Sequence, residues 1–532
     1  MSNSSAKHPK GLYPLFFTEM WERFGYYLML GILYLYMVDS IKPGDPKGGL
    51  GFGAADANDI YGTYIALVYL TPFIGGLLAD RILGYRRTIV IGGTLMGLGY
   101  LTLSLPGQTA FFIALGLIII GNGFFKPNIS TLLGNLYNEE RFKTRKDQGY
   151  NIFYMGINIG AFICNFVAAW LRNTYGWGYA FAAAGIGMFI GLAIFLFNQN
   201  KVREGDVLKP TNPEDMPLTR IFSVIFLPAI AFAFIGYLIP GTIFGSNTTD
   251  AFLFACVPVV YYYLSTYLNA SPEDKKPIGT LLYIFTVVII FWAIFHQNGN
   301  VLTAWAEETT NREMPTSMIN TAKALGMTQE VTAPDASAPT PAYLENLPKD
   351  KWPAEGRSLK LISTELFQSL NPFFVVLFTP LIISFFSFLR ARSKEPSTPG
   401  KIAWGLLITG LSTLVMIGAV YASSNGAEKV SPMWLVGAYG VITIGELCLS
   451  PMGLSLVSKV SPARLTSLMM GGWFLATSIG NKMSGVLGVI STLENKYLVF
   501  LINFGGAMLA AVLLFVMVKQ FREVVRAKTG HD

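Results

Sequence analysis

Residues 14–38 read PLFFTEMWERFGYYLMLGILYLYMV, a stretch that is apolar except for a few polar side chains and three charges, Glu19, Glu22 and Arg23. A helix needs about 20 mainly apolar residues to cross the hydrocarbon core of a bilayer. The stretch therefore predicts a membrane-spanning helix that carries three ionisable groups. Because such groups cost several kcal/mol inside a span, each is a candidate functional residue.

Similar apolar blocks fill most of the chain. It has 532 residues, of which 52% are hydrophobic and 13% are charged, with a mean hydropathy of +0.46. Soluble domains carry about 25% charged residues, so this composition cannot cover a water-soluble globule. We predict a multi-pass membrane protein with fourteen spans, at 14–38, 60–80, 87–105, 109–135, 149–171, 178–198, 218–239, 250–269, 278–305, 361–389, 401–422, 432–457, 466–490 and 496–518.

The links between the blocks alternate in basic charge. Those around 81–87, 141–146, 201–220, 390–401 and 519–528 are rich in Lys and Arg, whereas the opposite short links hold few. Basic links remain on the cytoplasmic side, so both termini are predicted to be cytoplasmic, which requires an even number of spans. This topology explains the net charge of +7 without nucleic-acid binding.

The spacing of the blocks predicts two six-helix bundles, 14–198 and 278–518, and two cytoplasmic tails, 1–13 and 519–532. A linker at 199–277 holds two extra spans, 218–239 and 250–269. Transporters built from two related halves bind substrate between the halves, near the bilayer midplane. Segment 306–360 is polar and predicted to be external, and its composition leaves open whether it is folded or disordered. The extra spans and this segment are expected to be peripheral to transport.

The charges of the first span share one helix face, because Glu19, Glu22 and Arg23 are three and four residues apart. Lys126 in the fourth span, next to Pro127, adds a second base, and Lys482 is a weaker candidate near the outer end of its span. A static salt bridge would explain one acid and one base. The additional acid favours a cluster whose protonation breaks ion pairs and switches conformation.

Enzymes and receptors are disfavoured. The sequence has no nucleotide-binding loop, no metal-ligand spacing and no nucleophile–base arrangement. Cys164, Cys256 and Cys448 each lie inside an apolar block and are predicted to be core residues. We therefore expect a protein that is not an enzyme, with no cofactor and with the proton as coupling ion.

Several motifs together carry a family resemblance. Glu19-x-x-Glu22-Arg23-Phe24-x-Tyr26-Tyr27 resembles the first-helix motif of the proton-dependent oligopeptide transporters (POT/PTR), in the major facilitator superfamily. Further matches follow in order over about residues 10–520, namely Asp80-Arg81 with Gly84, Phe125-Lys126-Pro127-Asn128, Phe153-Tyr154, Asn158, Phe291-Trp292, Asn371-Pro372, Glu446 with Ser450-Pro451 and Trp473-Phe474-Leu475-Ala476. The extra pair of spans resembles that of the prokaryotic, 14-helix members.

The resemblance implies an all-α membrane protein of the major facilitator fold. It would carry di- and tripeptides together with protons by alternating access, as a monomer in a bacterial inner membrane. The implied proton-coupling residues are Glu19, Glu22, Arg23, Lys126, His296 and Glu446. The implied substrate-binding residues are Tyr26, Tyr27, Tyr69, Lys126, Asn158, Asn371, Glu446, Trp473 and Thr477. Of these, Lys126 would face the peptide carboxylate and Glu446 its amino terminus.

Two positions depart from the family pattern. Leu30 stands where many members have an arginine, and His296 stands where many have an acid. Losing both partners together avoids an uncompensated buried charge. His296 is interpreted either as a replacement proton site or as a neutral hydrogen-bonding residue. Because of these changes, two alternatives stay open. The chain could be a family relative that carries another small solute, such as nitrate or an organic anion, or a proton-independent facilitator.

Overall fold

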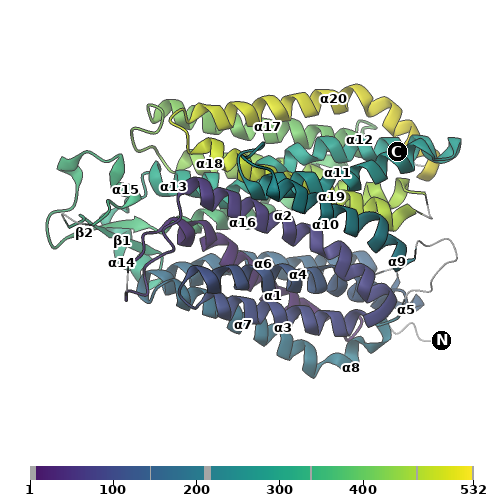
Figure 1. Cartoon of the computed structure of the whole chain (residues 1–532), viewed down its shortest axis with the longest axis horizontal. Helices are drawn as coiled ribbons and strands as arrows, with labels where there is room; N and C mark the ends of the chain where they lie inside the picture. Colours follow the sequence, from purple (N-terminus) through teal and green to yellow (C-terminus); the bar gives the residue numbers. More distant parts are fainter. Residues whose placement is uncertain are drawn as a thin grey trace. The chain divides into compact units, whose positions relative to one another are not determined.

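The computed structural model describes residues 8–42, 44–143, 145–208, 217–335, 338–462 and 465–529, so parts of both predicted tails lie outside the described residues. A long helix occupies each of the fourteen predicted spans (Figure 1). These helices are α1 (Leu12–Val38), α2 (Ala54–Leu78), α3 (Tyr85–Leu103), α4 (Gln108–Leu136), α6 (Lys146–Thr174), α7 (Trp177–Phe197), α9–η3–α10 (Leu218–Ile221, Phe222–Phe226, Leu227–Leu238), α11 (Asn247–Leu268), α12 (Pro272–Phe295), α16 (Leu370–Ala391), α17 (Thr398–Ala422), α18 (Met433–Val460), α19 (Thr466–Ser491) and α20 (Tyr497–Thr529).

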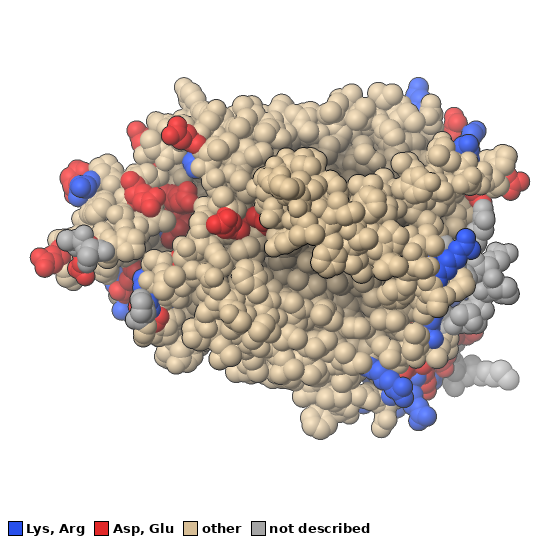
Figure 2. Space-filling model, viewed as in Figure 1, with Lys and Arg blue, Asp and Glu red and all other residues tan. Residues whose placement is uncertain are grey.

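The composition of these helices suits a bilayer. Within the described residues, eleven helices are long and apolar enough to cross a membrane. Figure 2 shows Lys, Arg, Asp and Glu gathered at the helix ends, while the sides of the helices on the face drawn are almost uncharged. The chain is therefore a multi-pass membrane protein, as predicted.

Three helix boundaries differ from the prediction in ways that matter below. Helix α2 begins at Ala54 rather than 60, which brings the polar residues Asn58 and Asp59 into its first turns. The span predicted to start at 361 starts later, because Ser358–Ile362 form strand β2. Helix α20 continues to Thr529, through residues predicted to be a tail.

The chain folds into two compact units. The first contains residues 1–53, 67–210 and 303–373, and the second contains 54–66, 211–302 and 374–532. Helix α2 is thus shared, since Ala54–Ala66 belong to the second unit and Leu67 onward belong to the first.

Small residues and amides hold the helices of the first unit together. A Cβ atom on Gly75 of α2 would collide with the backbone of Gly123 on α4, so the two helices touch through their main chains. Beside this contact, Asn122 Nδ2 of α4 donates to the carbonyl of Val68 at 2.9 Å. Thr71 Oγ1 of α2 donates to the carbonyl of Ile119 at 2.9 Å. Helix α4 is therefore fixed on the second part of α2.

The second unit uses the same devices. A Cβ atom on Gly405 of α17 would lie 2.9 Å from the carbonyl oxygen of Gly445 on α18. Gln297, just after α12, and Asn503 of α20 exchange two side-chain hydrogen bonds, at 3.1 and 2.8 Å. Interhelical hydrogen bonds of this kind stabilise helix association inside a membrane.

The polar segment after α12 is folded. Residues 309–363, here called the hairpin domain, contain α14 (Thr316–Ala324), α15 (Ala342–Glu345) and the antiparallel strands β1 (Thr328–Thr332) and β2 (Ser358–Ile362). The domain projects beyond the helix ends of the first unit (Figure 1). It has its own apolar core, made of Val331, Tyr343, Leu344, Leu347 and Leu361.

A buried arginine ties this domain to the end of α13 (Val301–Glu308). Arg312 has no exposed surface, and its Nη2 lies 3.0 Å from Glu307 Oε2. Its Nη1 donates to Gln329 Oε1 at 2.7 Å and to the carbonyl of Ile362 at 2.8 Å, so one side chain contacts both strands. The guanidinium also lies over the ring of Tyr343, 5.2 Å from its centre.

We predict that Arg312→Ala opens the hairpin domain and leaves the membrane helices intact. Removing one partner of a buried ion pair costs about 3 kcal/mol, which raises the open population about a hundredfold. Chymotrypsin should then cleave at the buried Tyr343 about a hundredfold faster. Arg357→Ala is the matched control, since Arg357 is exposed on the same domain. Equal cleavage rates in the two variants would contradict the role of Arg312.

Candidate functional site

The predicted charge cluster of α1 is present. Arg23 Nε donates to Glu19 Oε1 at 2.9 Å and lies 2.5 Å from Glu22 Oε2. All three side chains are buried within the first unit. Helical spacing places both acids within reach of the one guanidinium, as the sequence indicated.

Lys126 of α4 joins this cluster. Its charge acts on both Glu19 and Glu22, and its Nζ lies 4.1 Å from the centre of the Tyr69 ring on α2. The hydrogen bonds that fix α4 on α2 thus also position this lysine. Four charged residues predicted from sequence therefore lie together in the first unit, two acids and two bases.

The cluster is incompletely hydrogen-bonded. Within the described residues, Glu19 Oε2, Glu22 Oε1 and Arg23 Nη2 have no hydrogen-bond partner, and Glu22 Oε2 is in ion-pair contact with Arg23 Nε. A partly satisfied buried polar network is held less firmly than a fully satisfied one. Uptake of a proton by either acid would leave Arg23 and Lys126 with one counter-charge instead of two. The geometry can therefore couple protonation to rearrangement of α1 and α4.

The first unit also contains predicted substrate-binding residues, which are two tyrosines of α1 and two asparagines. The rings of Tyr26 and Tyr27 lie 5.3 Å apart, and the guanidinium of Arg23 lies 5.5 Å from the centre of the Tyr26 ring. Asn158 Nδ2 donates to the carbonyl of Tyr154 in its own helix, α6, at 2.9 Å. Asn371 lies half-buried in the first turn of α16.

Four predicted site residues lie in the second unit. Glu446 is half-buried on α18, and Trp473 of α19 packs its indole against Gly453 of α18. Thr477 Oγ1 donates to the carbonyl of Trp473 at 3.0 Å. His296 is buried where α12 ends, with its ring 5.3 Å from that of Trp292.

The structure adds three charged residues that the sequence did not single out, Asp59, Arg172 and Glu365, each paired with a base or an acid. In the second unit, Lys482 Nζ lies 2.6 Å from Asp59 Oδ1 of α2. In the first unit, Arg172 Nη1 of α6 donates to Glu365 Oε2 at 2.8 Å, and its guanidinium lies 4.3 Å from the centre of the Trp177 ring. Lys482 is the weaker candidate of the sequence analysis. Asp59 and Arg172 lie outside the predicted spans, and Glu365 lies inside the span predicted at 361–389 without having been singled out.

A family model described as the POT family matches residues 86–327 and 357–500, well over half of the chain. The chain belongs to the POT family. The match includes the residues around Lys126, Glu446 and Trp473, so the resemblance drawn from separate motifs is confirmed.

Known POT relatives align with nearly the whole chain. The di-/tripeptide transporter of Lactococcus lactis subsp. lactis is 33% identical over 88% of this chain and 87% of its own length. An uncharacterized transporter of Bacillus subtilis, YclF, is 32% identical over 91% of this chain and 89% of its own. A crystal structure of the peptide transporter POT in complex with sulfate is 30% identical, covers 97% of this chain and 96% of the other, and has a TM-score of 0.77.

These relatives are transporters, so the predictions of a major facilitator fold and of a protein that is not an enzyme are confirmed. Among the residues that the structure describes, the two strands of this POT chain lie in the hairpin domain. The roles of the individual site residues stay predictions.

We predict that Gly453→Ala destabilises the protein by displacing Trp473. A Cβ atom at 453 would overlap the indole ring, and overpacking of this kind costs about 2 kcal/mol. Gly437→Ala on the same helix is the control, because its Cβ would lie 3.5 Å from the nearest atom, in Val415. Thermal melting in detergent should show a lower Tm for Gly453→Ala alone. Equal Tm values would refute the tight packing of Trp473.

Proposed function

We propose that this POT protein is a proton-coupled symporter of di- and tripeptides that works by alternating access. The observation that carries the proposal is the buried group of Glu19, Glu22, Arg23 and Lys126, which combines two acids with two bases. A relative of similar length is named a di-/tripeptide transporter, which supports the substrate class.

Proton uptake by Glu22 or Glu19 removes one of the two negative charges that face Arg23 and Lys126. The released bases then attract another anion, and the carboxylate of a bound peptide supplies one. In this mechanism the proton and the peptide carboxylate together balance the charges of the cluster. Their joint binding therefore favours closure of the outward-open state. Opposite ends of a zwitterionic peptide require opposite charges, and we assign its carboxylate to Lys126 and its amino terminus to Glu446.

Aromatic and amide side chains complete the proposed binding residues. Tyr26, Tyr27, Tyr69 and Trp473 offer ring surfaces that accept many side chains with little discrimination. Asn158, Asn371 and Thr477 offer polar groups for the peptide backbone. His296 is proposed as a proton site of secondary importance, because its ring packs on Trp292 and Phe295.

The proposed orientation in the membrane follows from the distribution of charged side chains. In the first unit, Lys and Arg gather at the helix ends near α5 (Glu140–Lys143) and α8 (Gln199–Val202), whereas acidic side chains gather around the hairpin domain (Figure 2). By the positive-inside rule, the α5 end and both termini are cytoplasmic and the hairpin domain is external. We propose a monomer in the inner membrane of a bacterium, with no cofactor other than the proton.

We expect Glu22→Gln to reduce the pH-gradient-driven uptake of dialanine into proteoliposomes to less than about a tenth, because one Brønsted site contributes at least this factor. Counterflow exchange, which needs no net proton movement, should stay measurable. Glu428→Gln, a change of the same type at an exposed position, should leave both rates at the parental level. Undiminished gradient-driven accumulation in Glu22→Gln would refute the coupling role.

We expect Lys126→Ala to lower kcat/KM for dialanine at least about tenfold, since a hydrogen bond to a charged group contributes about 1.5–3 kcal/mol. Lys143→Ala, on the exposed side chain of α5, should have no effect. Initial uptake rates at several dialanine concentrations give kcat/KM for both variants. Parental rate and affinity in Lys126→Ala would exclude it as the carboxylate-binding residue.

Leu30 and His296 favour a second candidate, a POT member that carries another small solute or needs no proton. Leu30 is buried among apolar residues of α1, so the first unit lacks the additional base that many members have there. Competition by dialanine against labelled nitrate or organic anions, with and without a proton gradient, separates this candidate from the peptide symporter.

A further inference from the structure

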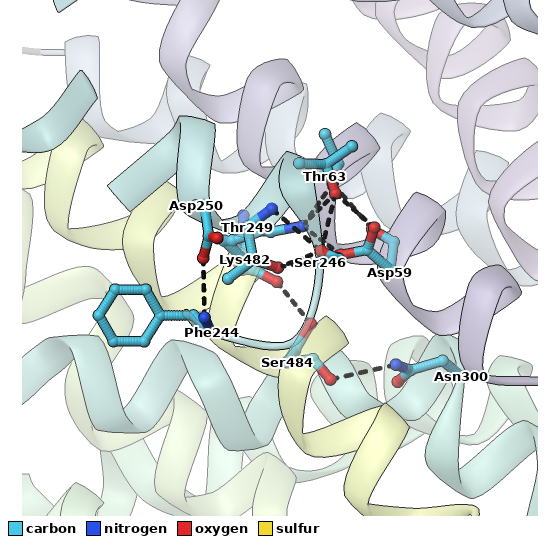
Figure 3. A network of polar contacts seen from close by, with 11 residues as sticks. Asp59, Thr63, Phe244, Ser246, Thr249, Asp250, Asn300, Lys482 and Ser484 are labelled. Atoms are coloured by element: carbon cyan, nitrogen blue, oxygen red, sulfur yellow. Dashed lines mark hydrogen bonds and ion pairs between the residues drawn. The ribbon is translucent and has the colours of Figure 1, made fainter. Parts of the chain in front are cut away.

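A buried polar network joins three helices of the second unit (Figure 3). Lys482 of α19 is at its centre, and its side chain has no exposed surface. Its Nζ donates to Asp59 Oδ1 at 2.6 Å and to Thr63 Oγ1 at 2.6 Å, both on α2. One lysine therefore connects α19 to two successive turns of α2.

The start of α11 surrounds the other side of the Asp59 carboxylate. Ser246 Oγ donates to Asp59 Oδ1 at 2.9 Å, and Thr249 Oγ1 donates to the same oxygen at 3.1 Å. Thr248 Oγ1 donates to Asp59 Oδ2. With the lysine and three hydroxyl groups around it, the carboxylate is fully hydrogen-bonded, which is the arrangement that makes a buried charge stable.

The hydroxyl groups are held in place by the turn before α11. Asp250 accepts hydrogen bonds from the backbone N–H groups of Ile243 and Phe244, both at 2.8 Å (Figure 3). Ser246 is the N-cap residue of α11 and accepts from the N–H of Thr249 at 3.1 Å. The α10–α11 pair, which the sequence predicted to be peripheral, thus presents a preformed set of donors to α2.

The same part of α2 has further contacts in the second unit. Gly62 and Gly485 of α19 are so close that a Cβ atom on Gly62 would lie 2.6 Å from the Cα of Gly485. Ser478 Oγ of α19 donates to the carbonyl of Ala66 at 2.6 Å, and Asn300 Nδ2 donates to Asn58 Oδ1 at 2.8 Å. These contacts end at Ala66, after which α2 belongs to the first unit.

We propose that Asp59, Lys482 and the hydroxyl groups of Ser246, Thr248 and Thr249 form a latch that holds Ala54–Ala66 of α2 on α19. In this role, the α10–α11 pair controls how readily α2 is released, and release is a step of the transport cycle. Alternating access requires the two units to rearrange, and α2 is anchored in both, so this part of α2 has to leave α19. Only the role of this release in the transport cycle rests on the proposed function.

The test measures release directly. Ser478 is fully buried under α2, so a cysteine there is labelled only when α2 moves away. In a background with Cys164, Cys256 and Cys448 replaced by Ala, Ser478→Cys is treated with a maleimide in detergent solution. Thr248→Val removes one hydrogen bond to the Asp59 carboxylate and should raise the labelling rate about tenfold, the effect of losing one hydrogen bond to a charged group.

Thr266→Val is the matched control on the same helix. Its hydroxyl donates to the carbonyl of Tyr262 within α11 and is outside the latch. Its labelling rate should equal that of the parent. Equal rates in Thr248→Val and the parent would overturn the proposal, and so would a rise shared by Thr266→Val, because that would indicate general loosening of α11.

A second pair of variants tests the ion pair itself. Lys482→Gln leaves Asp59 without its counter-charge, whereas Asp59→Asn combined with Lys482→Gln leaves no buried charge. Labelling should be faster than in the parent in both, and a parental rate in either would overturn the latch. Labelling needs no substrate, so a parent that fails to accumulate dialanine would refute the transport proposal alone, and the labelling rates would still decide whether the latch exists.

Discussion

An ion in an apolar interior must be compensated by an opposite charge or by several hydrogen bonds, because an uncompensated one costs more than most folds can supply. This constraint determines much of how the present chain packs. In the ion pairs Lys482–Asp59, Arg172–Glu365 and Arg312–Glu307 the basic side chain is buried. In the first two, the partners are far apart in sequence. Each pair requires two particular segments to lie together. Apolar contacts between membrane helices carry no such requirement, since lipid offers a helix an equally apolar neighbour.

The chain contains two kinds of buried charge, which differ in how completely they are compensated. Both oxygens of Asp59 accept hydrogen bonds, from a lysine and from hydroxyl groups. Glu22 Oε1 has no hydrogen-bond partner within the described residues, and Oε2 is in ion-pair contact with Arg23 Nε. A fully satisfied carboxylate is best suited to hold one arrangement, and a partly satisfied one is best suited to exchange its proton and its partners. This difference agrees with the two roles proposed above, holding for Asp59 and proton coupling for Glu22.

Local spacing was sufficient to predict part of the site. Glu19, Glu22 and Arg23 are within one turn of each other, so the helical period alone places them together. Lys126 was joined to them because it is another ionisable residue inside a predicted span, although no local rule relates α1 to α4. Arg172 and Glu365 are 193 residues apart, and nothing in either local sequence indicates the other.

The start of α2 shows why boundaries limit such predictions. The apolar block begins near residue 60, and Asn58 and Asp59 precede it as ordinary polar residues of a link. In the folded chain they are compensated by Asn300, Lys482 and the start of α11, so the helix can begin at Ala54. The hairpin domain is a similar case, since its composition resembles a disordered linker and its stability depends on one arginine and a small apolar core.

Helix α20 has 33 residues, which at 1.5 Å per residue makes a rod of about 50 Å. The hydrocarbon core of a bilayer is about 30 Å thick, so the last turns extend well past it into water. A fluorescent protein fused directly after Thr529 would be attached to the end of this long helix. Its emission anisotropy would then follow the tilt of α20 itself, and a small rotation at the base would become a displacement of several ångströms at the tip.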